Sequence, residues 1–217
     1  PTIVIDRNHN FNSIVTGSLG ATSDFTPGTY YNVKIYNNHA FVVSEASNHG
    51  LQVFNLKRLL DLNEFKMFNE DYIVNDFGNA HNIAINTSSG FAYILGSALY
   101  EGGPVFYDIS IPEQPILRGG FSDTSYIHDA QIITYKGEDQ NFFGKEILLG
   151  SNSDGGETNQ LIILDVTEKT NPVLISTISY SYGGYTHQGW IDESHRYFYL
   201  GDELDELRYG NKTRIIS

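Results

Sequence analysis

The sequence predicts an all-β protein, a β-propeller built from four-stranded blades, and three observations support this prediction. The 217 residues are 40% hydrophobic, which suits one domain with a substantial core. Fifteen Tyr, thirteen Phe and twenty-one Gly, against one Met, favour strands joined by tight turns over packed helices. One set of short apolar runs recurs about every fifty residues, which is typical of propeller blades.

The repeat contains predicted strands in a fixed order. First strands open with Tyr or His, at 31–35, 81–85, 128–132 and 187–191. Second strands are apolar runs that end in small or polar residues, at 41–45, 93–97, 147–151 and 198–202. Third strands are closed by an acid at 3–6, 105–108 and 162–165, with 51–55 as a variant. Turns rich in Pro and Asn precede a fourth strand such as 172–176, where proline suits an outer edge.

This register divides a single domain, 1–217, into blades. Full blades cover approximately 29–78, 79–125 and 126–184, and incomplete blades cover 1–28 and 185–217. Because both incomplete blades contain a third strand, they do not complement each other. We therefore expect that the natural protein has further residues at both ends, and that it has five or more blades in all. Only 56–68 has the apolar spacing of a helix, and we expect a short helical excursion there.

Charge and composition exclude several kinds of site. A net charge of -13 and a pI near 4.8 leave too few Lys and Arg for a nucleic-acid surface, so we expect no nucleic-acid partner. The excess of acidic side chains could bind cations, or it could simply be solvated at the surface. Without Cys there are no disulfides, thiolate metal sites or Cys nucleophiles. No apolar run is long enough for a transmembrane segment and no leader opens the chain, so we expect a mature or trimmed product.

Three histidines recur at the starts of predicted first strands: His81, His128 and His187. Because first strands line the central channel of a propeller, we expect these side chains to converge there. With Asp129 beside one of them, they could bind a divalent transition metal and leave positions open for water or substrate.

A second interpretation of this channel is a hydrogen-bonded polar ring without metal. The histidines are followed by Asn82, Asp129 and Gln188, which could bond to one another. The fourth first strand opens with Tyr31 instead of histidine, so the ring is asymmetric under either interpretation. Phosphate loops, nucleophile elbows and the His-Glu-x-x-His motif do not occur in the sequence.

Two acidic loops are candidates for calcium, which takes carboxylate and carbonyl oxygens at flexible turns. The loop 152–157 has permissive glycines but not the spacing of an EF-hand, and a long hairpin turn is the alternative. The loop 202–206 ends a second strand, and salt bridges or solvation are the alternatives there. The candidate ligands are Asp154, Glu157, Asp202, Glu203 and Asp205.

Two Asn-x-Ser/Thr triplets begin at Asn86 and Asn211. They would permit N-glycosylation only on a eukaryotic secretory route. Triplets of this kind also arise by chance.

Three ungapped strings carry a family resemblance. They are Val-Ser-Glu-Ala-Ser-Asn-His-Gly-Leu-Gln-Val-Phe at 43–54, His-Asp-Ala-Gln at 128–131, and Tyr-Thr-His-Gln-Gly-Trp at 185–190 followed by the acidic 202–206. In these strings the chain resembles the bacterial surface proteins called choice-of-anchor B, with LVIVD-type repeats, over nearly its whole length. The resemblance implies an exported propeller held at the cell surface by an anchor that differs between members. It implies no settled reaction and no catalytic residues.

Two functions follow as hypotheses. The first is an extracellular or cell-surface binding or scaffold module, cation-stabilised, with a protein, glycan or matrix ligand. The second is a metal-dependent enzyme, a hydrolase or lactonase, that works through the channel histidines.

Overall fold

The computed structural model describes residues 30–60, 62, 64–153 and 158–210, together with the backbone of the strands 2–7, 13–19 and 214–216. Strands make up 47% of the chain, which confirms the all-β prediction. They form three four-stranded sheets and two three-stranded sheets within the described residues.

The three four-stranded sheets are antiparallel, and each follows chain order from its first to its fourth strand. The first full sheet comprises β3 (Tyr31–Tyr36), β4 (His39–Ser44), β5 (Leu51–Asn55) and β7 (Tyr72–Val74). The second full sheet comprises β8 (Asn82–Asn86), β9 (Phe91–Leu95), β10 (Val105–Asp108) and β11 (Ile116–Gly120). The third full sheet comprises β12 (Ile127–Thr134), β13 (Glu146–Ser153), β14 (Asn159–Asp165) and β15 (Val173–Ser179).

The two smaller sheets lie at the ends of the chain. The C-terminal sheet comprises β16 (Thr186–Ile191), β17 (Phe198–Asp202) and β18 (Arg214–Ile216), all antiparallel. The N-terminal sheet comprises β1 (Thr2–Arg7), β2 (Ser13–Leu19) and β6 (Lys66–Phe68). Because β6 pairs with β2 in parallel, this sheet joins segments that are far apart in the sequence.

The prediction of a helix over 56–68 is largely wrong. Among the described residues of this segment only a single 3-10 turn forms, η1 (Leu56–Leu59), and the Asn55 side chain caps it by accepting a hydrogen bond from the Lys57 amide. Residues 66–68 form β6 instead, because pairing with β2 satisfies their backbone groups. The sequence also did not predict the short helices η2 (Leu99–Gly102) and α1 (Asp205–Tyr209).

Neighbouring full sheets pack face to face through apolar side chains that alternate along each strand. In β4, Phe41 and Val43 pack between the first and second full sheets, whereas Ala40 and Val42 pack on the opposite face with Phe68 of β6. The central strands are therefore buried on both faces, which explains why their sequences are continuous apolar runs.

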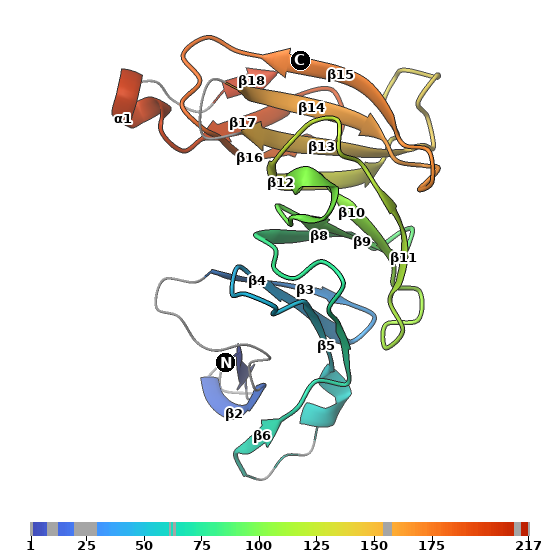
Figure 1. Cartoon of the computed structure of the whole chain (residues 1–217), viewed down its shortest axis with the longest axis vertical. Coiled ribbons are helices and arrows are strands. Elements are labelled where there is room, and N and C mark those ends of the chain that lie inside the picture. Colours follow the sequence, from blue (N-terminus) through green and yellow to red (C-terminus); the bar gives the residue numbers. More distant parts are fainter. Residues whose placement is uncertain are drawn as a thin grey trace.

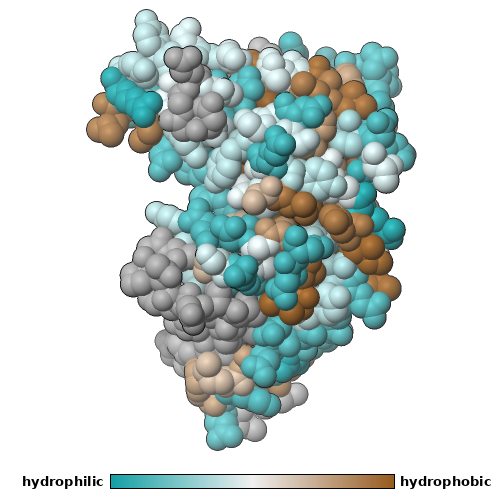
Figure 2. All heavy atoms as spheres, in the orientation of Figure 1, coloured by the Kyte–Doolittle hydropathy of each residue, from teal (hydrophilic) through white to brown (hydrophobic). Residues whose placement is uncertain are grey.

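The first strands of successive sheets lie next to one another. β8 contacts β3 on one side and β12 on the other, and β12 also contacts β16. In Figure 1 the full sheets are stacked in chain order along the longest axis of the molecule. Figure 2 shows hydrophobic residues along the edge where β11 runs, which agrees with the partial exposure of Ile116 and Leu117. The fold thus brings residues at equivalent positions of the first strands together.

Candidate metal centre

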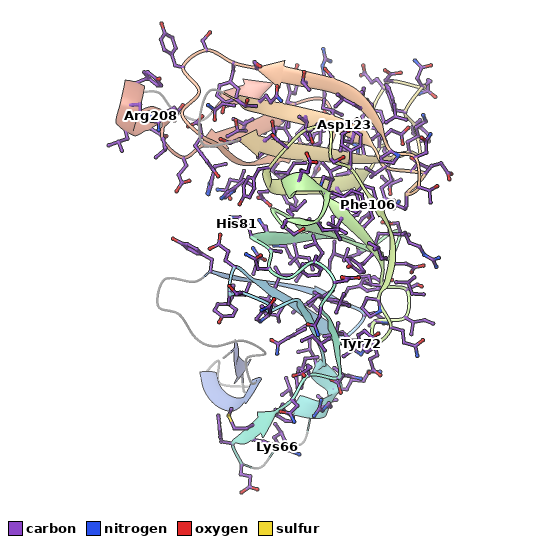
Figure 3. All side chains as sticks on the ribbon, viewed as in Figure 1. Lys66, Tyr72, His81, Phe106, Asp123 and Arg208 are labelled. Carbon is purple, nitrogen blue, oxygen red and sulfur yellow. The ribbon has the colours of Figure 1, made fainter. Side chains whose placement is uncertain are left out.

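The three predicted channel histidines form one row. The ring centroids of His81 and His128 are 4.0 Å apart, and those of His128 and His187 are 4.4 Å apart. His128 lies in the middle and is buried, while the two outer rings are partly exposed. Figure 3 labels His81 beside the end of β8 at which that strand begins.

Local irregularities of the strands place these rings. The register of β12 against β13 shifts between Ile127 and Asp129, and that of β16 against β17 shifts between Thr186 and Gln188. His128 and His187 are the extra residues at these two β-bulges. A bulge re-aims the side chain it carries, and here both imidazoles lie in the row with the ring that precedes β8.

Two carboxylates flank the row. The Nδ1 of His81 lies 2.6 Å from the Oε1 of Glu45, which follows β4 in the first full sheet. The Nε2 of His187 lies 3.9 Å from the Oε2 of Glu203, which follows β17. Glu45 and Glu203 occupy equivalent places, because the amide of each donates to the carbonyl of the tyrosine before the adjacent first strand. The sequence did not single out Glu45.

The hydrogen bond of His128 fixes its tautomer. Its Nδ1 lies 3.0 Å from the carbonyl oxygen of His187, and since a carbonyl only accepts, Nδ1 carries the proton. In the neutral ring the Nε2 lone pair is then available to a ligand. Metal-binding histidines characteristically hold their second nitrogen in this way.

His128, His187 and Glu203 could hold a metal ion together. Each offers one ligand atom, and all three atoms lie within 4.8 Å of one another. Two imidazoles and one carboxylate form a donor set suited to zinc and to neighbouring first-row ions, and three protein ligands leave positions for water. Because Glu203 joins the histidines, one of the predicted calcium ligands belongs to this group.

The electrostatics of the row favour a neutral imidazole at His128. Burial, followed by like-charge repulsion from the adjacent His81 and His187, lowers the pKa of His128 from 6.5 to about 4. Metal ions bind unprotonated imidazole, so His128 needs no deprotonation to act as a ligand at neutral pH.

Three tyrosines line the same site. The ring of Tyr185 meets His128 edge-on at 5.4 Å, Tyr126 lies 6.3 Å from both His81 and His128, and Tyr30 lies 6.3 Å from His81. Burial raises the pKa of Tyr126 and of Tyr185, so both hydroxyls stay protonated. The sequence analysis missed them, although the spacing Tyr-x-His recurs at 126–128 and 185–187.

Asp129 lies beside this group and is not one of its three members. Its Oδ1 accepts hydrogen bonds of 2.8 Å from the Asn82 side chain and from the Ala130 amide. Burial raises its pKa. The hydrogen bond between Asn82 and Asp129 is one of those expected in a polar ring, which was the alternative to a metal site in the sequence analysis.

Tyr31, the residue that the sequence pattern placed at the fourth of these positions, lies apart from the row. Its ring packs edge-on against His49 at 5.6 Å and joins the apolar cluster on the far face of the first full sheet. β3 pairs with β4 from Tyr31 onward without a bulge, so this strand lacks the feature that re-aims His128 and His187.

The other predicted calcium ligands fall in three places. Asp154 and Glu157 lie outside the described residues. The Asp202 carboxylate accepts hydrogen bonds from the Tyr180 hydroxyl and from the amides of Gly184, Tyr185, Leu204 and Asp205. Asp205 is buried at the start of α1. Asp202 thus organises the loop before β16 and the turn before α1.

The two asparagines of the predicted glycosylation triplets have different outcomes. Asn86 is buried, and its Nδ2, the atom that would carry a glycan, donates to Glu146 at 2.7 Å. A glycan has no room at this position, because Asn86 is only 5% exposed. Asn211 lies outside the described residues.

The fold and this group of side chains define an all-β protein with a candidate His/Glu metal centre. No family model matches the chain. No curated protein matches it either. The helices in the described part of the chain are too short and too polar for a membrane span.

Proposed function

We propose that the protein is a β-propeller binding module that holds a divalent transition-metal ion at one end of its first strands. The propeller is supported by three consecutive four-stranded meanders whose first strands lie together. The observation that carries the metal is the group of His128, His187 and Glu203, with ligand atoms within 4.8 Å of one another. The resemblance to choice-of-anchor B proteins supports a place at the cell surface, with a protein, glycan or matrix ligand.

Metal content tests this proposal directly. After the purified chain is loaded with Zn²⁺ and dialysed, we expect it to retain about one ion per chain, as measured by elemental mass spectrometry. His187→Ala should lose the ion, because two protein ligands rarely retain zinc. His195→Ala is the matched control, since His195 accepts from the Lys136 amide outside the row. A wild-type chain that retains no zinc, or a His187→Ala chain that retains it fully, would reject the metal centre.

Metal-dependent hydrolysis is the second candidate, and a specific contact favours it. His81 is not among the three grouped ligands, yet its ring lies 4.0 Å from that of His128 and its Nδ1 is held by Glu45 at 2.6 Å. A histidine oriented by a carboxylate beside a metal-bound water is suited to act as a general base.

Ester and lactone probes test this second function. A zinc-loaded wild-type chain should hydrolyse them faster than the EDTA-treated chain. His81→Gln should lower the rate about 10²-fold while the zinc content stays at the wild-type value. Equal rates for wild type and His81→Gln would exclude the histidine as the base and leave binding as the function.

A further inference from the structure

The side chain of Tyr126 has a fixed place beside the histidine row. The centroid of its ring lies 6.3 Å from those of both His81 and His128. The ring rests on Gly96, because a Cβ added to that glycine would come within 2.8 Å of the Tyr126 Cε2 atom. Gly96 also has a φ of +66°, which favours glycine. The second full sheet thus provides a slot that fits this phenol ring.

Buried polar side chains hold the backbone of Tyr126 and of Tyr185 at equivalent places. The Nδ2 of Asn152 donates to the carbonyl oxygen of Tyr126 at 2.7 Å. The Asp202 carboxylate accepts from the amide of Tyr185 at 2.8 Å. Asn152 and Asp202 correspond to each other, since each pairs with the residue that follows the tyrosine. The backbone of both tyrosines is therefore fixed by the fold itself, as a preorganised site requires.

The hydroxyl groups of Tyr126 and Tyr185 can donate hydrogen bonds to a ligand. Within the described part of the chain, neither hydroxyl forms a hydrogen bond to another residue. The hydroxyl of Tyr126 interacts electrostatically with that of Tyr185, and Tyr185 interacts with both Glu45 and Glu203. Because such interactions weaken with distance, the two hydroxyls lie near each other, on the side of the row where the carboxylates lie.

This site stays open where sheets lie on both sides of it. Tyr126 precedes β12, which contacts the first strands of both neighbouring sheets, yet its side chain is only partly buried. Glu45 follows β4 in the first full sheet, which also has a sheet on either side, and its side chain is 35% exposed. Tyr185 and Glu203 are the counterparts of these residues in the C-terminal sheet. Access to the site therefore does not depend on that sheet being the last one.

We propose that the metal centre binds the carboxylate of a small organic acid, with one oxygen on the ion and the other accepting from the Tyr126 and Tyr185 hydroxyls. This inference rests on the metal centre proposed above and adds the class of its ligand. A divalent ion held by two neutral imidazoles and one carboxylate keeps a unit of positive charge, which an anion neutralises. Phenols at neutral pH are protonated, and tyrosine hydroxyls stabilise oxyanions in other sites. The charge of Glu45 is compensated in part by His81, which contacts it at 2.6 Å.

Cobalt makes the test direct, because Co²⁺ accepts the ligands of zinc and its visible spectrum responds to a change of coordination. Acetate should change the spectrum of the Co²⁺-loaded chain saturably, with a dissociation constant of about 1 mM. Acetamide has the same shape without the charge, and we expect it to bind at least about tenfold more weakly. A chain that retains no cobalt would refute the metal centre and this inference together. A chain that retains cobalt but does not respond to acetate, or that binds both compounds equally, would overturn the carboxylate site alone.

Variants assign the effect to the two phenols. Tyr126→Phe and Tyr185→Phe keep the rings and remove only the hydroxyls, so each should weaken acetate binding about tenfold while the cobalt content stays at the wild-type value. Tyr182→Phe is the matched control, because Tyr182 is exposed and contacts Tyr209 away from the row. Wild-type affinity for acetate in both Tyr126→Phe and Tyr185→Phe would mean that the ion alone binds the anion, and this result would contradict the inference.

Discussion

The imidazole rings of His81 and His128, which belong to successive sheets, lie 4.0 Å apart at a tilt of 45°. Rings this close repel each other when both are protonated, so a proton on one disfavours a proton on the other. Glu45 compensates charge on His81 only, because it contacts that ring and not His128. The middle ring of the row is therefore the one we expect to stay neutral.

The first prediction concerns the titration of His128 in the metal-free protein. Its pKa of about 4 lies below the ordinary 6.5, first through burial and then through the adjacent histidines. The unfolded chain binds more protons between these two values, so the stability that His128 contributes is present above pH 6.5 and is lost as pH falls toward 4. NMR titration of the imidazole signals in EDTA measures this pKa.

A variant of the neighbouring ring tests the cause. His81→Gln should raise the pKa of His128 while leaving it below 6.5, because burial persists. His195→Gln, which changes a histidine outside the row, should leave it unchanged. A wild-type His128 that titrates at 6.5 would show that the ring is neither buried nor crowded in solution.

The second prediction concerns Asp202. Burial alone would raise its pKa, but hydrogen bonds from the Tyr180 hydroxyl and from backbone amides lower it below the ordinary value. Asp202→Asn should reduce the free energy of unfolding by about 1–3 kcal/mol at pH 7, since charge-assisted bonds are lost. The depressed pKa makes this contribution full above the unfolded pKa, and it disappears as pH falls through the folded value. The difference from wild type should therefore shrink in acid.

Urea unfolding at pH 7 and in mild acid checks this prediction. Glu206→Gln is the control, because Glu206 is an exposed acid in the same short helix. A change of equal size in both variants would mean that the loss reflects net charge rather than the hydrogen bonds of Asp202.

Much of the strand pattern was predictable from the sequence, because period and burial act locally. The third strand 51–55 and the second strand 198–202 agree with β5 and β17. In β5 the residues alternate between two buried faces, and this leaves an apolar run bounded by turns. β6 could not be predicted, since its three residues are stabilised by β2, which lies far away in the sequence. The helix α1 could have been suspected from Gly210, which ends it in the left-handed conformation.

The candidate site was predictable in part. The recurring His81, His128 and His187 indicated convergence, and the rings do converge. The role of Glu203 was not predictable, because the bulge that turns His187 toward it depends on pairing with β17. Single-sequence reasoning locates residues on strands, but bulges decide which way their side chains point.

The third prediction concerns a buried ion pair between the second and third full sheets. Glu146 and Lys169 are both 9% exposed, and the carboxylate also accepts from Asn86 and Ser89. Glu146→Ala should cost about 3–5 kcal/mol of unfolding free energy, because it leaves a buried ammonium group without its partner.

A matched pair of replacements separates pairing from packing. Replacing Glu146→Leu together with Lys169→Met should cost less than Glu146→Ala, since no buried charge remains. Arg118→Ala, which removes an exposed partner of Asp108, should cost at most about 1 kcal/mol. Chemical unfolding measures all three, and a cost for Glu146→Ala no larger than that for Arg118→Ala would contradict the burial of the pair.

The fourth prediction links the metal centre to stability. A ligand that binds only the folded chain stabilises it by mass action, so Zn²⁺ at about 100 times its dissociation constant should add about 2.7 kcal/mol and raise Tm. Glu203→Gln keeps the size of the side chain but removes the anionic ligand, and it should abolish most of this rise. Glu193→Gln, an exposed acid in the turn between β16 and β17, should respond to zinc as wild type does. Differential scanning calorimetry measures the shift, and a rise that survives Glu203→Gln unchanged would place any zinc on the acidic surface instead of at the histidines.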